Sequence, residues 1–523
     1  MPRIDHFDTD IAIVGSGFAG AITALALGRR GKRVAIIERG RHPRFAIGES
    51  STPLANLLLE EIADRYDLPR LRVFSKWGTW QRERPEVAVG LKRGFTFLFH
   101  EAGKPFPEDA EHHRQLLVAA SPHDEIGDTH WYRPDFDHAL VRDAQAEGAV
   151  YLDETRLDRF REEGSGVVLD GARQGRDVSV SARFVIDASG PRGFLHHALG
   201  LRSTPPEWLP PTQALFTHFE GVERWDRLVP QERTPPYPMD DAALHHVFDG
   251  GWMWILRFNN GITSAGVALT DRIAKELRAE EGAAAWSRVL DMLPSVRDQF
   301  RAARPTMPFV YAPRLAFRSR EVCGRRWALL PSAAGVVDPL LSTGFPLTLL
   351  GIVRLLDVLE GTVEGPEREA ALGAYARSTL DELDATEQLV AALYATMADP
   401  PLFKRLTLLY FAAASYAETA RRLGRPELAP GFLLHAHPTF GEHVRACAEL
   451  ASRAHAGTVR QALLARIDRA IEPFDVAGLL DRSRGDWYPA LGTDLMANRS
   501  KLNASAEEVQ RLLERCGFVS PKA

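Results

Sequence analysis

Gly15, Gly17 and Gly20 stand at the spacing G-x-G-x-x-G, between an apolar run at 11–14 and an alanine-rich stretch at 21–30. The first glycine permits a tight turn, the second lets the backbone approach a pyrophosphate, and the third lets a helix pack closely on a strand. Amides at the start of the following helix favour a phosphate group. The pattern therefore predicts a strand, a phosphate-binding turn and a helix.

Glu38 completes this unit, because it follows a second apolar run at 34–37, about 20 residues beyond the glycines. Its carboxylate can accept hydrogen bonds from ribose hydroxyls, and it disfavours the 2′-phosphate of NADP. The glycine pattern alone is a weak signal. With the strand, helix, second strand and acid all in order, it indicates a dinucleotide site.

Three later segments indicate which dinucleotide binds: Asp187-Ala188-Ser189-Gly190, Asp338-Pro339 within 331–344, and Arg133 in Arg-Pro-Asp-Phe-Asp. In their order along the chain, from Arg133 through Asp187 to Asp338, these segments resemble the later motifs of the flavoproteins with two dinucleotide-binding domains. The resemblance implies FAD and an α/β fold like that of hydroxybenzoate hydroxylase, in which a distant strand and helix return to hold the flavin. Gly164-Ser165-Gly166 lacks a following helix and predicts a hairpin turn. With no second nucleotide motif, we expect a separate NAD(P)H-dependent flavin reductase to supply reduced flavin.

Three further segments together resemble the flavin-dependent halogenases: Gly90–Phe97 with Lys92, Gly251–Leu256 with Trp252 and Trp254, and Asp338–Gly344. They match the family's Lys-x-Gly-x-x-Phe segment, the start of its Trp-x-Trp motif and its halide-binding loop. The resemblance runs over about the first 360 residues. It is nearest to the branch that acts on phenols and phloroglucinol-type compounds.

The resemblance implies a reaction in which FADH2, oxygen and chloride or bromide generate hypohalous acid, which Lys92 relays to an electron-rich phenolic small molecule. Lysine suits this role because it is a compact donor whose pKa falls when it is desolvated. Backbone amides at Thr343 and Gly344 are expected to hold the halide. Trp252, Trp254 and Pro339 are expected to wall the passage from flavin to lysine.

The residues expected to contact FAD belong to the glycine turn, the segments after it and the later motifs. They are Gly15, Gly17, Phe18, Ala19, Gly20, Glu38, Arg39, Gly48, Glu49, Ser50, Arg133, Asp187, Ala188, Ser332, Asp338 and Gly344.

Several positions depart from the family pattern. Arg257 replaces the proline that ends the Trp-x-Trp motif, and Ser332 replaces a flavin-contacting aspartate. Leu341 stands where tryptophan halogenases carry a glutamate, which argues against tryptophan as substrate. Lys76 is a rival to Lys92, because Lys-x-Gly also occurs there. His100 and Glu101 are candidate substrate bases, but the sequence assigns neither.

The elements that must position these residues fall into two regions. Residues 1–345 are predicted to form the FAD-binding and halogenase core, with a substrate-side β-sheet inserted at about 200–310. Residues 346–523 are predicted to be mainly helical and to cover the substrate site, as apolar residues at Leu349, Val353 and Leu356 indicate.

The composition sets broad limits. The 523 residues are 45% hydrophobic and 25% charged, with a net charge of −5, so neither nucleic acid nor a membrane is expected as a partner. Three scattered cysteines argue against disulfides or a metal site. No apolar run is long enough to span a bilayer. We expect a soluble cytoplasmic protein, and the family resemblance suggests a homodimer.

Three other functions remain open. An FAD-dependent aromatic monooxygenase would share the FAD motifs, and Arg257 keeps that alternative alive. A flavin-bound assembly component without catalysis would leave Lys92 and the tryptophans unexplained. A geranylgeranyl-type reductase shares the general fold but predicts no lysine segment.

Overall fold

The structure is a computed structural model that describes residues 4–107, 111–362, 364–454 and 457–518. A six-stranded sheet lies under the glycine turn, with the order β21-β22-β12-β2-β3-β8. Five of its strands are parallel, and its three central strands are buried at every position, as expected for a parallel sheet covered on both faces. The strands are β2 (Ile11–Val14), β3 (Val34–Ile37), β8 (Val150–Leu152), β12 (Phe184–Asp187), β21 (Cys323–Gly324) and β22 (Trp327–Leu329).

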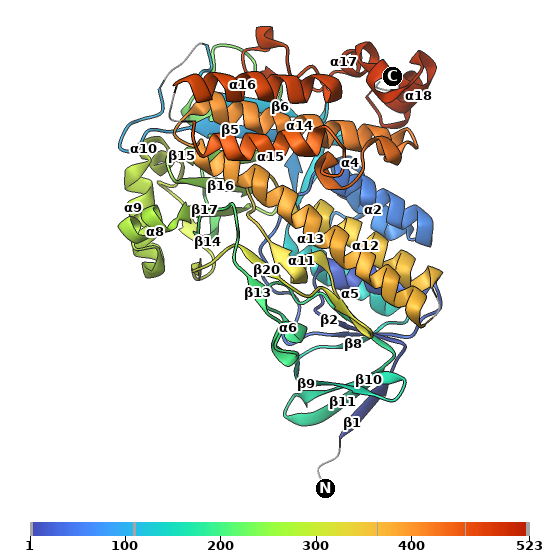
Figure 1. Cartoon of the computed structure of the whole chain (residues 1–523). Helices are drawn as coiled ribbons and strands as arrows, with labels where there is room; N and C mark the ends of the chain where they lie inside the picture. The colour runs from blue at the N-terminus through green and yellow to red at the C-terminus, as the bar shows by residue number, and fades with distance from the viewer. Residues whose placement is uncertain (1–3, 108–110, 363, 455–456, 519–523) are drawn as a thin grey trace.

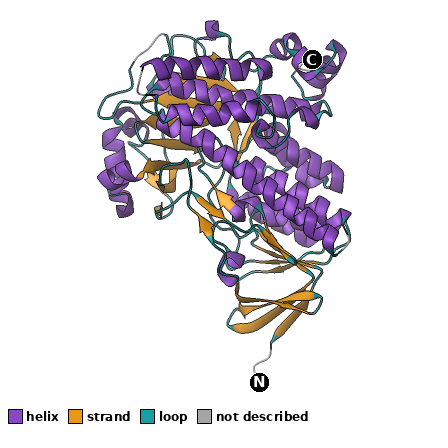
Figure 2. Ribbon diagram, in the orientation of Figure 1, coloured by secondary structure: helices purple, strands orange, loops and turns teal. Residues whose placement is uncertain are grey.

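The predicted FAD-binding α/β fold is confirmed. Helix α1 (Phe18–Arg29) follows the glycine turn and packs against α5 (Arg133–Ala146) and α12 (Gly344–Gly361). The predicted hairpin at 164–166 joins β9 (Thr155–Glu163) to β10 (Gly166–Arg173). These strands, with β11 (Arg176–Ala182) and β1 (Asp5–Asp8), form a separate sheet at the lower end of the molecule in Figures 1 and 2.

A nine-stranded sheet forms the second layer, and it extends beyond the insertion predicted at about 200–310. It includes strands from before the predicted insertion and one from near the C-terminus. In chain order its principal strands are β5 (Gly94–Phe99), β6 (Gln115–Ala119), β14 (Thr212–Glu220), β15 (Ala243–Phe248), β16 (Gly251–Arg257), β17 (Ile262–Thr270) and β24 (Trp487–Tyr488). The segment after Lys92 is therefore part of the same sheet as the Trp-x-Trp motif.

The two faces of this sheet bury different side chains. Trp252 and Trp254 face the main core, whereas Met253 and Ile255 face a second core beside α8 (Asp271–Leu277), α9 (Ala283–Met292) and α10 (Pro294–Gln299). This alternation follows from the period-two geometry of a strand. It directs both tryptophans to the side on which the glycine turn lies.

The C-terminal region is mainly helical, as predicted, although residues 487–488 form β24. Its long helices lie across the upper and right-hand parts of the molecule in Figure 1. They are α12, α13 (Pro366–Ala395), α14 (Pro400–Arg422), α15 (Phe440–Ala451), α16 (Gly457–Ile471) and α18 (Ala506–Arg515). All of them except α18 contribute side chains to the continuous core that they share with the six-stranded sheet. Within the described residues, none of the helices combines the length and apolar character needed to cross a bilayer.

Arg257, the residue in place of the motif proline, ends β16 and ties it to a neighbouring loop. Its Nε donates to Asp240 Oδ1 at 2.7 Å, and its two other nitrogens donate to the carbonyls of Val222 at 2.8 Å and Glu223 at 2.5 Å. The Asp240 side chain is fully buried. Arginine at this position thus performs a structural task.

We expect Arg257→Ala to lower the free energy of unfolding by about 3 kcal/mol, because removing one partner of a buried ion pair leaves the other charge unpaired. The measurement is denaturant unfolding followed by tryptophan fluorescence. Arg301→Ala is the control: that arginine is 81% exposed and pairs with Asp298 at the surface, so its loss should change stability by less than about 0.5 kcal/mol. Equal stabilities of the two variants would contradict this account.

Candidate functional site

The three glycines form a tight cradle at the end of β2. Gly15 has a φ of +102°, and a Cβ there would lie 2.6 Å from the carbonyl oxygen of Ala188. A Cβ on Gly20 would lie 2.0 Å from the Gly15 carbonyl oxygen. Gly17 is the N-cap residue immediately before α1 and provides no side-chain cap. Only glycine allows this close approach of turn, helix and strand, so the cradle fits a bound pyrophosphate.

Glu38 lies beside this cradle, in a buried hydrogen-bond network that the sequence did not predict. Its carboxylate accepts from Ser16 N at 3.1 Å, Ser16 Oγ at 2.8 Å, Gly40 N at 2.9 Å and Arg44 Nη2 at 3.0 Å. Burial raises the pKa of Glu38, but Arg44 and the hydrogen bonds outweigh burial and lower it overall. An ionised carboxylate suits ribose hydroxyls. Arg39, also predicted here, is exposed.

Arg133 joins three segments around the start of α1. Its guanidinium pairs with Asp137, with Nε–Oδ1 at 2.7 Å and Nη2–Oδ2 at 2.8 Å, and Nη1 donates to the carbonyls of Ile47 and Gly48. Asp137 Oδ1 also accepts from the Phe18 amide at 3.2 Å. A cation is therefore held beside the helix start, which fits a phosphate group. Ala19, also predicted, is buried next to Phe18.

Asp187 uses its carboxylate to order its own turn. It accepts from the amides of Ser189 at 2.8 Å and Leu195 at 2.7 Å, and from the Ser189 hydroxyl. These bonds set the turn that carries Ala188 over Gly15. Burial raises the pKa of Asp187 in spite of these bonds.

Glu49 and Ser332, which were also predicted to contact FAD, lie in two different parts of the fold. Glu49 Oε1 pairs with His218 Nε2 of β14 at 2.8 Å, which links the segment after the glycine unit to the large sheet. Ser332 is half-buried in the short helix α11 (Pro331–Ala334).

Lys92 ends β4 (Val89–Lys92), and its side chain is completely buried. Its Nζ donates to Ser51 O at 2.5 Å and Ser50 Oγ at 2.9 Å, and lies 3.5 Å from Ser342 Oγ. Nζ also lies 3.7 Å from the centre of the Phe95 ring. The structure thus brings together Lys92, the predicted FAD-contacting Ser50 and the predicted halide loop.

Burial of Lys92 favours its neutral amine form. Burial lowers the pKa of Lys92 to about 7, and the nearby Asp128 only partly offsets this effect. Near neutral pH the side chain can therefore exist both as an ammonium donor and as a nucleophilic amine.

The loop from Asp338 to Gly344 is tied to the tryptophans by Tyr394, which the sequence did not single out. The Trp252 indole donates to Tyr394 Oη at 3.1 Å, and Tyr394 Oη donates to Asp338 Oδ2 at 2.9 Å. Asp338 Oδ1 accepts from the Leu340 amide at 3.0 Å. Burial raises the pKa of Asp338 to about 7, with these bonds offsetting part of the effect.

The remaining predicted residues of the loop lie at its two ends. Pro339 is half-buried beside Asp338, Thr343 is the buried residue that precedes α12, and Gly344 is exposed as the first residue of that helix. The side chains of Trp252 and Trp254 are buried together, with ring centres 5.6 Å apart. The Trp254 indole donates to Ser264 Oγ at 3.2 Å.

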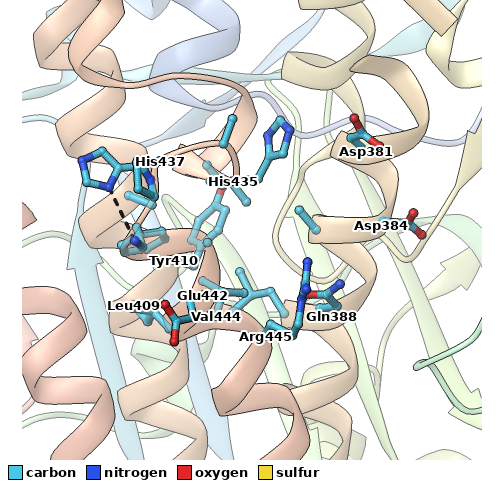
Figure 3. Close-up of a pocket in the computed structure, with 18 residues that line it drawn as sticks. Asp381, Asp384, Gln388, Leu409, Tyr410, His435, His437, Glu442, Val444 and Arg445 are labelled. Carbon is cyan, nitrogen blue, oxygen red and sulfur yellow. Dashed lines mark hydrogen bonds between the residues drawn. The ribbon is translucent and has the colours of Figure 1, made fainter. Parts of the chain in front are cut away.

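Two cavities lie against the C-terminal helices, and Lys92 lines neither; the one bordered by the neighbours of the lysine is called the inner cavity and the other the outer cavity. The inner one, about 190 Å³, has Phe95 of β5 and Asp128 in its wall, together with Asn56 from α2 (Pro53–Tyr66) and parts of α14 and α18. The outer one, about 560 Å³, lies between α13, α14 and α15. In Figure 3, Asp381 and Asp384 lie on one side of the outer cavity and His435 and His437 on the other. Tyr410 and Leu433 line both cavities.

The other candidates from the sequence lie elsewhere. Lys76 is half-buried in the wall of the inner cavity, at the start of α4 (Trp77–Glu83). His100 is buried in the second core, where its Nε2 lies 2.9 Å from His246 Nδ1. Glu101 pairs with Lys104 and Arg114 near the surface. Neither His100 nor Glu101 lines the inner cavity formed by the described residues.

The chain is similar in sequence to a known protein family and to two characterised halogenases. Residues 10–317 match the family model of FAD dependent oxidoreductases. Tetracycline 7-halogenase from Kitasatospora aureofaciens is 33% identical, over 65% of this chain and 61% of its own length. Monodechloroaminopyrrolnitrin halogenase PrnC from Pseudomonas fluorescens is 31% identical, over 76% of this chain and 69% of its own length.

The fold matches that of halogenase PltM, with a TM-score of 0.81 and 25% sequence identity over 91% of this chain and 99% of that chain. A second crystal structure of PltM, in complex with phloroglucinol and FAD, matches with a TM-score of 0.78 and 25% identity, over 94% of this chain and 99% of that one.

We expect Gly15→Ala to weaken FAD binding by about tenfold or more, equivalent to about 1.4 kcal/mol, because the added Cβ would displace Ala188 from the cradle. Titration of the apoprotein with FAD, followed by flavin fluorescence, measures the effect. Gly31→Ala is the matched control. Gly31 also has a positive φ, of +72°, but no atom lies within 4 Å of the position that a Cβ would take there, so this variant tests backbone strain alone. Unchanged FAD affinity in Gly15→Ala would show that the cradle does not hold the cofactor.

Proposed function

The chain belongs to the FAD-dependent oxidoreductases and, among them, to the flavin-dependent halogenases, and from this premise we propose that it halogenates a free phenolic small molecule through Lys92. The observation that carries the proposal is the position of the lysine. Its Nζ lies between Ser342 of the loop at 338–344 and Phe95, whose ring lines the inner cavity.

The proposed FAD site consists of the glycine cradle, Glu38 and Arg133. The other residues that the sequence predicted to contact FAD are proposed to complete it. FADH2 held by these residues would, with oxygen and chloride or bromide, supply hypohalous acid. Amides at Thr343 and Gly344 are the proposed halide donors, since successive backbone amides form anion-binding concavities.

Lys92 then has two ways to direct the oxidant. As an ammonium it can donate a hydrogen bond to the oxygen of hypohalous acid and orient the halogen. As an amine it can take the halogen on nitrogen and pass it on. Both forms are accessible because burial lowers the pKa of this lysine to about 7.

The chain Trp252–Tyr394–Asp338 gives the proposed passage a rigid wall, because it joins β16, α13 and the loop by two hydrogen bonds. Such a wall keeps the organic substrate away from the flavin, where direct contact would permit hydroxylation. We further propose that the helices after residue 346 cover the substrate, as α14 and α18 line the inner cavity.

A phenolic substrate is favoured by two observations. PltM, which shares this fold, has been crystallised with phloroglucinol. Leu341 is also apolar and fully buried where tryptophan halogenases carry a glutamate.

Reduced flavin is proposed to come from a separate NAD(P)H-dependent reductase. The monooxygenase alternative loses its main support, because Arg257 is engaged in anchoring a loop through Asp240.

We expect Lys92→Ala to reduce halogenated product by about 100-fold or more, the scale of losing a positioned acid–base or nucleophilic group. Reactions contain flavin reductase, NADH, FAD, oxygen and bromide, with a panel of phenols and resorcinols. Mass spectrometry then detects the isotope pairs of brominated products.

Two comparisons make this result specific. Oxygen consumption should continue in Lys92→Ala, because the flavin chemistry does not need the lysine. Lys76→Ala should retain halogenation, with at most a raised KM, because Lys76 lies in the cavity wall rather than beside the loop. Products that gain only oxygen, in both wild type and Lys92→Ala, would instead identify a monooxygenase.

A further inference from the structure

Asp128 faces Lys92 across a two-stranded ribbon. It begins β7 (Asp128–Trp131), which pairs antiparallel with β4 so that Asp128 stands directly opposite Lys92. Side chains of directly opposed residues in such a pair lie on the same face, about 5 Å apart at Cβ. The carboxylate is therefore placed beside the proposed catalytic lysine.

One oxygen of the Asp128 carboxylate has no hydrogen-bond partner among the described residues. Asp128 Oδ1 accepts from Asn56 Nδ2 at 2.7 Å, but within the described part of the chain Asp128 Oδ2 is buried without a hydrogen-bond partner. Asn56 Oδ1 is likewise buried and unpartnered among those residues. Buried acceptors are almost always satisfied, so two of them side by side indicate a missing donor.

Both residues lie in the wall of the inner cavity, together with Phe95, Tyr410 and Phe411. Aromatic rings favour the edge and face contacts that a second ring provides. Within this cavity, carboxylate and amide oxygens can accept hydrogen bonds, whereas these three rings present apolar surface. A hydroxylated aromatic molecule supplies both the apolar ring and the hydrogen-bond donor that this combination lacks.

We propose that Asp128 is a catalytic residue that accepts the hydroxyl proton of the aromatic substrate, and that Asn56 is the positioning residue that holds its carboxylate. This inference rests on the proposed halogenase function and assigns the substrate base that the sequence left open.

The step balances as follows. The substrate O–H proton moves to Asp128 Oδ2 while the oxygen lone pair pushes electrons into the ring. The ring carbon attacks the halogen of hypohalous acid, so the carbon–halogen bond forms and the halogen–oxygen bond breaks. Hydroxide leaves, the halogen is reduced and the ring is oxidised. The ring C–H proton then converts hydroxide to water, and the proton on Asp128 returns to the product oxygen.

The charges around Asp128 set its pH dependence. Lys92 faces it from β4, Glu60 lies on α2 with Asn56, and Tyr410, Glu418 and Arg422 come from α14. Burial raises the pKa of Asp128 above that of an ordinary carboxyl group, and Lys92, Asn56 and Arg422 partly oppose this effect. The ionised, proton-accepting form therefore appears at higher pH than for an exposed aspartate, and kcat/KM should rise with pH as Asp128 ionises.

The test compares Asp128→Asn with wild type on two substrates: a phenol that wild type halogenates and a fluorinated analogue whose hydroxyl is already ionised at the assay pH. The expected result is a fall in kcat of about 100-fold on the phenol, typical of losing a general base, and of less than about threefold on the analogue. Asp298→Asn, a change at a surface ion pair, is the matched control. Equal rates of Asp128→Asn and wild type on the phenol, or equal losses on both substrates, would overturn the inference.

A second assay measures the hypohalous acid that each protein forms, by trapping it with a freely diffusing halogen acceptor. This assay distinguishes a failure of the Asp128 proposal from a failure of the proposed halogenase function. A wild-type protein that makes no halogenated product from any phenol refutes the proposed function. A wild type that halogenates, alongside an Asp128→Asn variant that still makes hypohalous acid but fails on the phenol, supports Asp128 as the base.

Asn56→Ala provides a second readout if Asp128→Asn does not fold. Removal of the Asn56 hydrogen bond raises the pKa of Asp128, because that bond stabilises the carboxylate. The acidic limb of the kcat/KM profile should therefore move to higher pH. A merely structural role would lower the rate without moving the limb, and an unmoved limb would contradict the proposal.

Discussion

The complete burial of the Lys92 amino group is the constraint on which the rest of the site depends. An amine without exposed surface costs stability in its charged form unless other groups solvate it. Here Ser50, Ser51 and Ser342 supply oxygens, and the Phe95 ring supplies a π face. These four residues come from three separate parts of the chain. The lysine therefore requires the segment after the glycine unit, the large sheet and the loop before α12 to meet at one point.

The two sheets make that meeting possible. The parallel sheet fixes the glycine cradle and the start of α1, while the nine-stranded sheet carries Phe95 and the tryptophans on its inner face. Polar contacts then tie the large sheet to the segments around it: Glu49 of the segment after the glycine unit pairs with His218, and a chain of hydrogen bonds runs from Trp252 through Tyr394 to Asp338. Buried polar groups of this kind rigidify a site because each must be satisfied. These contacts hold Trp252, Asp338 and the strand that carries Phe95 in fixed positions around the lysine.

Local sequence patterns predicted the parallel sheet well. Buried parallel strands appear in the sequence as short apolar runs, and the spacing of the glycines indicates where the backbone makes a tight turn. The strands at 11–14, 34–37 and 184–187 lie where the sequence indicated. The extent of the large sheet was not predictable in this way. Strand β24 joins β6 across more than three hundred residues, and no local pattern reports such a pairing.

The same limit applies to side chains. Glu38 and Lys92 belong to spaced motifs and were predicted. Arg44, Tyr394, Asn56 and Asp128 stand in no motif, and only the fold brings them to their partners. Asp128 is the clearest case: its sequence neighbours give no hint that it faces Lys92, which lies 36 positions away in the chain.

Arg257 shows how a departure from a family motif can be architectural rather than chemical. A proline at the end of β16 would fix φ and leave the strand without a donor. The arginine instead holds the end of the strand through Asp240 and two backbone carbonyls. It lies three residues after Trp254 in the same strand. Alternation along β16 places Trp254 on the face toward the main core, whereas Arg257 binds the loop between β14 and β15. The tryptophans can therefore keep their orientation while the residue that ends their strand changes, because strand pairing with β15 and β17 sets their direction.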